Sequence, residues 1–371
     1  MKIAIDAFGC DHSKSGWGSY LFYFVKNIPA DYEDDFELFG SEIDRYTYKS
    51  EKEYKYVSVN IPDNLRAEQR WHRHKNVAFV NKNNYDLVIY PAVERVIPKK
   101  FQKNSIAVMN SIFSTIKETS RRKIRHQVKK GLENVSLIIA PSKFIKDDLV
   151  KNGIDEKKIH VIYNGIDHKM FYPILDNDTE FVEIKPFAIK RPYFIYGSRL
   201  SGEEKKHLEL IEAFNIFKKK TGAPHRLVLA GSDGDFSEQI KKAAYDSEFA
   251  TDIFITGYFP HESFPKLYAG STACVFPSVN EGVGLPILEA MACGIPVLCS
   301  NSGALKEVGG DAPIYFDSNN VNEIAEDLEK IISDEVLYKQ KVDAGLERAN
   351  HFNWEETVMQ TLEYAQQLLK K

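Results

Sequence analysis

Residues 273–300 read ACVFPSVNEGVGLPILEAMACGIPVLCS. The apolar runs at the two ends, 273–277 and 296–299, are typical of buried strands, and the segment between them combines a glycine-rich turn with a short apolar helix. Such a turn directs the N–H groups of a helix N-terminus towards an anion, which the helix dipole also favours. Two carboxylates, Glu281 just before the helix and Glu289 about one turn inside it, add acceptors for hydroxyl groups. The stretch therefore predicts a site for a polyhydroxylated ligand that carries phosphate, and a sugar nucleotide is such a ligand.

Short apolar runs alternate with helical patterns through the whole chain, which is typical of βαβ units and parallel sheets. Its 371 residues are many for one hydrophobic core. We therefore expect an α/β protein with two Rossmann-like domains that face each other across a cleft, where ligands bind outside the carboxyl ends of the strands. The expected strands are Ile3–Ala7, Tyr56–Val59, Leu87–Tyr90, Ser105–Met109, Leu137–Ala140, His160–Tyr163, Tyr193–Tyr196, Leu227–Ala230, Ile253–Ile255, Ala273–Phe276, Val297–Cys299 and Ile314–Phe316.

The predicted domains are residues 1–175 and residues 176–352. Residues 176–191 show no clear periodicity and have prolines nearby, so we expect a linker there. One more helix is expected within residues 353–371, and it either ends the second domain or crosses back to brace the first. Its apolar positions are Val358, Leu362, Ala365 and Leu369.

The composition, with 43% hydrophobic and 27% charged residues, is that of a globular protein. No window approaches the roughly 18 apolar residues that span a bilayer. The N-terminus begins directly with a strand that contains Asp6, unlike a signal peptide. We expect a cytoplasmic protein, or at most one at the inner face of a membrane. The cysteines, which show no metal-ligand spacing and are expected to be reduced, are Cys10, Cys274, Cys293 and Cys299.

Charge is unevenly distributed between the two halves. Residues 1–175 carry 29 Lys and Arg against 22 Asp and Glu, whereas the remainder carries 20 against 31. Basic residues gather in two stretches, 66–75 and 117–130, which suit helices on an anionic membrane, contact with an acidic acceptor, or simple solvation. Binding of nucleic acid is not expected, because no recognised binding module accompanies them. Their basic residues are Arg66, Arg70, Arg73, Lys75, Lys117, Arg121, Arg122, Lys123, Arg125, Lys129 and Lys130.

A first glycine loop, with Gly16 and Gly18, follows the opening strand. It departs from the G-x-G-x-x-G pattern, because Leu21 stands where the third glycine is expected. A simple strand-to-helix turn explains it as well as close approach of the backbone to a phosphate or a sugar ring.

A basic pair follows the first strand of the second domain. Arg199 ends this strand, and Lys205 stands just before a helix. Cations at a helix N-terminus oppose the helix dipole, so an anionic ligand would explain them. The alternative is a solvated charge cluster with Glu203 and Glu204.

Both glutamates of the opening stretch have ordinary alternatives. Glu289 would suit a solvated helix face, and Glu281 a simple acid before a helix. However, apolar residues follow Glu289, and an unpaired carboxylate in a buried helix is unfavourable. Vicinal sugar hydroxyls supply paired donors for such a carboxylate, so we favour a ligand-binding role.

The motif from Glu281 to Val297 resembles the E-x7-E signature of the retaining glycosyltransferases of family 4, which have the GT-B fold. The similarity covers nearly the whole chain and is most specific over residues 196–310. Further matching segments are the glycine loop, Tyr163–Asp167 with Phe171–Pro173, Gly197–Arg199 with Lys205, Leu210–Phe214, Gly257 with Tyr258, Ser302 and Gly303 with Glu307, and Phe352–Glu355.

The resemblance implies a role for each matching residue. Arg199 and Lys205 would hold the donor diphosphate and take over the electrostatic task of a metal ion, so that no metal or other cofactor is expected. Glu281 would bind hydroxyls of the donor sugar, and Glu289 those of the ribose. The remaining implied substrate-binding residues are Gly16 and Gly18 at the diphosphate, Gly257 and Tyr258 around the base, and Gly282, Val283, Gly284 and Leu285 at the sugar and phosphate.

One position departs from the family pattern. Many members carry His-Asp after the fourth strand of the first domain, where this chain reads Met109-Asn110-Ser111. Asn110 can still bind a hydroxyl group, but it cannot carry a proton near neutral pH. In the family the leaving phosphate is expected to take the acceptor proton, so the change concerns the acceptor site more than the activity.

These features predict a retaining, metal-independent hexosyltransferase. It would move a sugar from a nucleotide sugar to a saccharide or lipid-linked saccharide in the synthesis of cell-surface polysaccharide. The alternative from another class is a non-catalytic sugar-nucleotide-binding or scaffold protein, which the missing His-Asp suggests. A sugar-nucleotide epimerase with the same fold would need catalytic acids and histidines that the sequence does not display.

Overall fold

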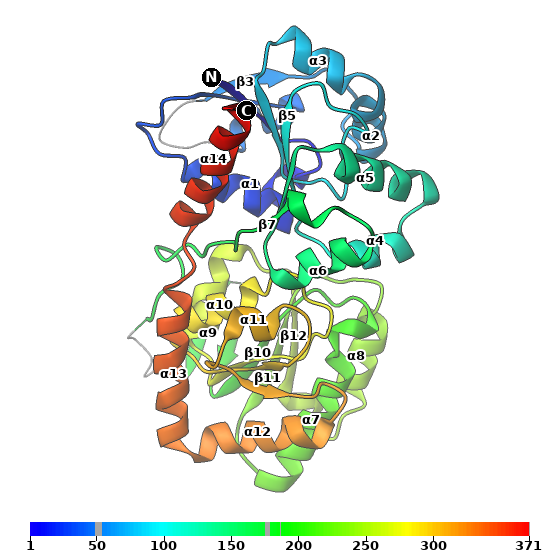
Figure 1. Cartoon of the computed structure of the whole chain (residues 1–371). Coiled ribbons are helices and arrows are strands. Elements are labelled where there is room, and N and C mark those ends of the chain that lie inside the picture. Colours follow the sequence, from blue (N-terminus) through cyan, green and yellow to red (C-terminus); the bar gives the residue numbers. More distant parts are fainter. Residues whose placement is uncertain (49–53, 175–178, 186, 371) are drawn as a thin grey trace. The chain divides into compact units, whose positions relative to one another are not determined.

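The computed structural model describes residues 1–48, 54–174, 179–185 and 187–370. Its chain forms two compact units, and the first combines Met1–Gly165 with Asn353–Lys371 (Figure 1). Ile166–Phe352 form the second unit. The boundary predicted after residue 175 therefore lies inside the second unit, and the last helix belongs to the first.

In the described part of the first unit, seven parallel strands form one sheet in the order β3-β2-β1-β4-β5-β6-β7. Central strands such as β4 are buried along their whole length, as expected for a parallel sheet covered on both faces. The strands are β1 Lys2–Asp6, β2 Asp35–Gly40, β3 Lys55–Ser58, β4 Leu87–Tyr90, β5 Asn104–Val108, β6 Leu137–Ala140 and β7 Ile159–Val161. The helices are α1 Gly16–Lys26, α2 Leu65–His74, α3 Asn76–Lys82, α4 Phe113–Thr119, α5 Arg122–Asn134, α6 Lys143–Lys151 and α14 Trp354–Leu369.

Strand β2 is absent from the predicted set, because Asp35 and Glu37 interrupt its apolar pattern. Glu37 is buried in the sheet, and its carboxylate accepts hydrogen bonds from Lys55 Nζ at 2.7 Å and from the Tyr85 hydroxyl at 2.9 Å. These donors stabilise the negative charge of the buried Glu37, which the sequence pattern alone predicts to be exposed.

Helix α14 lies beside α1 in the first unit (Figure 1). The Trp354 ring stacks on Tyr23, with centroids 5.3 Å apart, and meets Tyr20 edge-on at 5.5 Å. Val358 and Leu362 are completely buried in the same core. Of the two placements predicted for this helix, the structure shows the one that braces the first unit.

In the described part of the second unit, six parallel strands form a sheet in the order β12-β11-β10-β13-β14-β15. The strands are β10 Tyr193–Gly197, β11 Arg226–Ala230, β12 Ile253–Gly257, β13 Ala273–Phe276, β14 Val297–Ser300 and β15 Ile314–Phe316. The helices are α7 His207–Thr221, α8 Ser237–Tyr245, α9 Phe264–Ala269, α10 Leu285–Ala292, α11 Leu305–Gly309, α12 Val321–Ser333 and α13 Glu335–Ala349.

The predicted linker 176–191 contains structure of its own. Strands β8, Phe181–Ile184, and β9, Phe187–Lys190, pair in antiparallel fashion within the second unit. Val182, Ile184 and Ile189 are buried, and Val182 faces Ile189 in the register. Residues 176–178 and 186 of this segment lie outside the described residues.

No helix in the described parts of the chain has both the length and the apolar character that a bilayer crossing needs.

Candidate functional site

The second sheet has one point where the strand order changes direction. Strands β11 and β12 lie on one side of β10, and β13, β14 and β15 lie on the other. Since β10 and β13 are parallel neighbours, the loops after them leave the sheet from adjacent positions and diverge. Ligands of open α/β sheets bind at such a switch point. The loop after β10 carries Arg199 and Lys205, and the loop after β13 carries Glu281.

The structure brings Lys205 and Glu281 into direct contact. Lys205 Nζ lies 2.5 Å from Glu281 Oε1, and the Ser278 hydroxyl donates to the same oxygen at 3.1 Å. The side chains of Lys205 and Glu281 are 21% and 17% exposed, so the pair is partly shielded from water and still open to a ligand. The Tyr196 hydroxyl donates a hydrogen bond to the backbone carbonyl oxygen of Lys205 at 2.9 Å and so holds the backbone of this lysine in place. A cation and a carboxylate thus lie side by side where a charged, hydroxylated ligand is expected.

Arg199 occupies a different position on the same edge. It is exposed, and its Nε donates to the carbonyl oxygen of Asp233, in the loop after β11, at 3.3 Å. The structure therefore places Arg199 beside the β11 loop and does not bond it to the Lys205–Glu281 pair.

The backbone of Glu281 is held by the turn that precedes α11. Ala304 N–H donates to the carbonyl oxygen of Glu281 at 2.8 Å. A Cβ atom at Gly303 would lie 2.5 Å from that oxygen, so only glycine fits so close to Glu281. The turn residues Gly282 and Gly284 are buried, whereas Val283 and Leu285 are half-buried. Helix α10 begins at Leu285, as the glycine turn predicts.

Glu289 has a partner that the sequence did not reveal. His261 Nε2 lies 3.0 Å from Glu289 Oε1, and the Glu289 side chain is 12% exposed. Burial lowers the pKa of His261, but the charge of Glu289 and the hydrogen bond to it have a larger combined effect, so the pKa is raised above its ordinary value. The sequence argument considered only sugar hydroxyls as donors to Glu289, and the structure adds His261 as a protein partner. Nearby, Gly257 ends β12, and Tyr258 is 70% exposed.

The first sheet has its own switch point, between β1 and β4. The glycine loop follows β1, and within it Gly18 N–H donates to the Ser15 hydroxyl at 3.4 Å at the start of α1. A Cβ atom at Gly18 would lie 2.3 Å from the carbonyl oxygen of Cys10, so this position also accepts glycine alone. Gly16, the first residue of α1, is exposed. Asn110 follows β5, and its side chain lies 3.5 Å from the carbonyl oxygen of Pro91 and 3.3 Å from Asn164 Nδ2.

Two residues of α2 support the glycine loop from inside the unit. His72 Nε2 lies 2.6 Å from Asp6 Oδ2, both side chains are buried, and Asp6 Oδ1 accepts from Phe8 N–H at 3.0 Å. Glu68 Oε2 accepts from Gly9 N–H at 3.1 Å. Hence His72 belongs to the interior, although the sequence groups it with basic residues of a surface stretch.

The second basic stretch does lie on the surface. Helix α5 buries Gln127, Val128, Gly131 and Leu132, and its opposite face carries cations. Arg125 is half-buried and donates to the carbonyl oxygen of Lys117. The exposed basic residues, here called the basic face, are Lys117, Arg121, Arg122, Lys123, Lys129 and Lys130.

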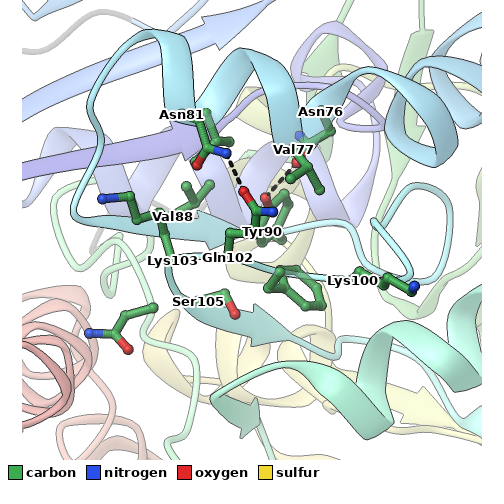
Figure 2. Close-up of a pocket in the computed structure, with 12 residues that line it drawn as sticks. Asn76, Val77, Asn81, Val88, Tyr90, Lys100, Gln102, Lys103 and Ser105 are labelled. Carbon is green, nitrogen blue, oxygen red and sulfur yellow. Dashed lines mark hydrogen bonds between the residues drawn. The ribbon is translucent and has the colours of Figure 1, made fainter.

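A small cavity lies elsewhere in the first unit, between α3 and the segment before β5 (Figure 2). The Tyr90 hydroxyl donates to Asn76 Oδ1 at 2.9 Å at its wall, and Asn81 bonds to Gln102. Its volume of about 10 Å³ suits one water molecule and excludes a sugar. Among the described residues, Asn76 Nδ2 has no protein partner, and a water here would bind it.

Within the described residues, no group of three or more His, Cys, Asp and Glu side chains has an arrangement that would hold a metal ion.

Comparison with protein families gives two matches. The family described as "Glycosyl transferases group 1" matches residues 177–348, the range that contains Arg199, Lys205, Glu281 and Glu289. The family described as "Glycosyltransferase Family 4" matches residues 34–169, which include Asn110. The first match therefore lies within the second unit, and the second match lies almost wholly within the first unit.

Curated relatives resemble part of the chain. The O-antigen chain mannosyltransferase B of Escherichia coli is 35% identical over 161 residues, which cover 43% of this chain and 42% of that protein. Alpha-maltose-1-phosphate synthase of Mycolicibacterium smegmatis is 27% identical over 250 residues, 63% of each protein. The chain thus spans between 42% and 63% of the length of these two relatives.

Solved structures resemble the whole chain. Sucrose-phosphate synthase from Thermosynechococcus elongatus gives a TM-score of 0.76 at 20% identity and covers 100% of this chain and 99% of its own. The Anabaena protein HepE, solved in complex with UDP and glucose, gives 0.74 at 17% identity and covers 99% of both chains. At these identities the likeness concerns the fold.

Proposed function

We propose that this chain, which belongs to the glycosyltransferases of family 4, transfers a sugar from a nucleotide-sugar donor to a saccharide or lipid-linked saccharide acceptor. Its two α/β units with parallel sheets have the GT-B fold. The observation that carries the proposal is the contact between Lys205 and Glu281 at the switch point of the second sheet. This contact joins a group for phosphate to a group for sugar hydroxyls at one edge.

Each group would have a separate task in the transfer. Lys205, with Arg199 from the same loop, would neutralise the negative charge that grows on the diphosphate as the glycosidic bond breaks. Glu281 would accept hydrogen bonds from the donor sugar, while the turn Gly282–Leu285 offers backbone N–H groups. Glu289, paired with His261, would accept hydrogen bonds from the hydroxyl groups of the ribose. Gly257 and Tyr258 would frame the base.

We further infer a retaining reaction without a metal ion. The acceptor oxygen would form its bond to the anomeric carbon on the face from which the phosphate leaves. The bond between that carbon and the phosphate oxygen breaks, its electron pair stays on the phosphate, and the acceptor proton moves to the same phosphate. Lys205 and Arg199 supply the positive charge that such a step requires.

The relatives support a class of substrates. The named mannosyltransferase acts on O-antigen chains, and HepE was solved with UDP and glucose, so a nucleoside diphosphate hexose and a role in surface polysaccharide synthesis are the best-supported choices. The scaffold alternative rests on Asn110, which replaces a histidine, and the first experiment separates the two.

We expect a nucleotide sugar to raise the melting temperature of the protein. A ligand at about 100 times its Kd stabilises the folded state by about 2.7 kcal/mol, which is a shift of several degrees. The measurement is a thermal-shift series with UDP-, GDP-, ADP- and TDP-sugars, followed by a transfer assay with the donor that binds. No shift with any of them overturns the donor site, and a shift without transfer to any saccharide favours the scaffold protein.

We also propose that the basic face rests on an anionic membrane. Each basic residue near such a surface contributes about 1 kcal/mol, so changing Arg121, Arg122 and Lys123 to glutamine should weaken binding to phosphatidylserine vesicles by about two orders of magnitude. Vesicle flotation measures the bound fraction. The same change at the exposed Lys219, Lys220 and Lys242 of the second unit is the matched control. Equal loss in both variants, or no binding by the wild-type protein, contradicts the proposal.

A further inference from the structure

A buried glutamate lies at the switch point of the first sheet. Glu94 follows β4, its residue is only 6% exposed, and within the described residues neither of its carboxylate oxygens has a hydrogen-bond partner. A buried polar group without a partner destabilises a fold, and native proteins keep few of them. Such a residue on the edge where α/β sheets bind ligands suggests that a ligand supplies the partner.

Three loops surround this carboxyl group. The indole of Trp17, in the first turn of α1, lies close to it, as do the Asn110 peptide and the Ser111 side chain after β5, although none of them meets the geometry of a full hydrogen bond. Trp17, Asn110 and Ser111 are half-buried, so they are more accessible than Glu94 itself. Arg95 ties the β4 loop to the glycine loop, because its Nη1 donates to the carbonyl oxygen of Gly9 at 3.0 Å.

A second buried acceptor lies on the same edge. Asn164 is 5% exposed, its Nδ2 donates to Asn110 Oδ1 at 3.3 Å, and its Oδ1 has no partner within the described residues. Glu94 and Asn164 therefore both lie close to Asn110, and both have acceptor oxygens without a protein partner among the described residues. Acceptors need donors, and a saccharide presents several hydroxyl donors at short spacing.

The charge of Glu94 changes near neutral pH. Burial raises its pKa to about 7, and the neighbouring Trp17, Asn110 and Ser111 groups offset only part of this effect. The ionised form offers two acceptor oxygens, whereas the protonated form uses one oxygen as a donor. Other charged groups on this edge are engaged elsewhere: Arg95 with Asp11, Glu68 with Gly9, His12 with Asp44, and His72 with Asp6.

We propose that Glu94 and Asn164 bind hydroxyl groups of the saccharide acceptor on either side of Asn110. The inference rests on the proposed function, since it assigns residues to the acceptor of that reaction. Glu94 then supplies the titratable group that residue 110 lacks. The hydroxyls of the bound sugar complete the hydrogen bonds that the carboxylate and the amide leave open.

The test uses methyl α-mannoside as the probe and measures its Kd by NMR titration of the full chain at pH 6 and pH 8. With a pKa near 7, the ionised fraction of Glu94 rises about tenfold over this range. We therefore expect the wild-type affinity to rise by up to about tenfold from pH 6 to pH 8. The Glu94→Gln variant should bind at least about tenfold more weakly at pH 8, because a hydrogen bond to a charged group is lost, and should show no pH dependence. A pH dependence that arises from His12, whose pKa is lowered by burial but raised above its ordinary value by its hydrogen bond to Asp44, would survive in this variant.

The matched control is Glu37→Gln, which changes another buried glutamate of the same unit, in β2. It should keep the wild-type Kd for the probe. Asn164→Ala is the second variant and should also weaken binding, so the proposal stays testable if Glu94→Gln does not fold.

The outcomes separate this inference from the proposed function. Wild-type affinity in Glu94→Gln and in Asn164→Ala overturns the acceptor-binding role, even when the protein transfers sugar. The acceptor-binding role is also overturned if Glu37→Gln weakens binding of the probe as much as Glu94→Gln does, or if the wild-type protein does not bind the probe. Failure of the proposed function appears instead as the absence of any thermal shift with nucleotide sugars.

Discussion

The Glu281→Gln variant is expected to transfer sugar about 10²–10³ times more slowly than the wild-type protein while it keeps its fold. Glutamine has nearly the same volume, so packing at this half-buried position is conserved. It cannot form the ion pair that joins Glu281 to Lys205 at 2.5 Å, and its amide presents donors where the donor sugar also has donors. Steady-state kinetics with the donor found by thermal shift measure the loss.

The control for this variant is Glu238→Gln, which changes an exposed glutamate on α8 of the same unit. Its turnover should match that of the wild-type protein. Undiminished turnover in Glu281→Gln would remove Glu281 from the donor site.

Replacing Lys205 by methionine should lower kcat/KM for the donor by about 10² or more. Methionine keeps an unbranched side chain of similar length but removes the charge that would face the diphosphate. Lys205 and Glu281 are in contact. We therefore expect the fold-loss in kcat/KM of the double variant, Lys205→Met with Glu281→Gln, to be smaller than the product of the two single fold-losses. A double-mutant cycle in kcat/KM measures this coupling.

The neighbouring Lys206 provides a matched control, since its ammonium pairs with Glu209 at 2.7 Å. The Lys206→Met variant should retain activity within a few-fold of the wild-type protein. Strictly multiplicative losses at Lys205 and Glu281 would show that the two side chains act separately.

The parallel strands could be predicted because most of them are buried on both faces and appear in the sequence as unbroken apolar runs, as in β4 and β13. Strand β2 was missed because Glu37 relies on partners in β3 and near β4 for its burial. Likewise, the antiparallel strands β8 and β9 have few buried positions, so their sequence resembles that of a loop. In both cases the deciding contacts are tertiary, which a local pattern does not contain.

In the candidate site, too, local features could be predicted from the sequence, whereas tertiary contacts could not. The glycines and the apolar spacing of the motif around Glu281 predict its turn and helix from local sequence, although Ala304 from the turn before α11 also holds the backbone of Glu281. The partner of Glu289, His261, comes from a different loop, and the partner of Asp6, His72, comes from a helix far along the chain. Glu94 carries no motif at all. It is distinguished only because its carboxylate is buried without a hydrogen-bond partner among the described residues, and this follows from the folded structure and not from the local sequence.

The route of the chain through the first unit has a consequence for biosynthesis. Trp354, Val358 and Leu362 complete the core of this unit, yet they follow the whole of the second unit in the sequence. A ribosome therefore finishes the second unit before it releases the segment that closes the first. Until then residues 1–165 expose the surface around Tyr20 and Tyr23 that α14 later covers, and nascent chains with such apolar surfaces are the ones that chaperones retain. The unit that starts first is thus the unit that matures last.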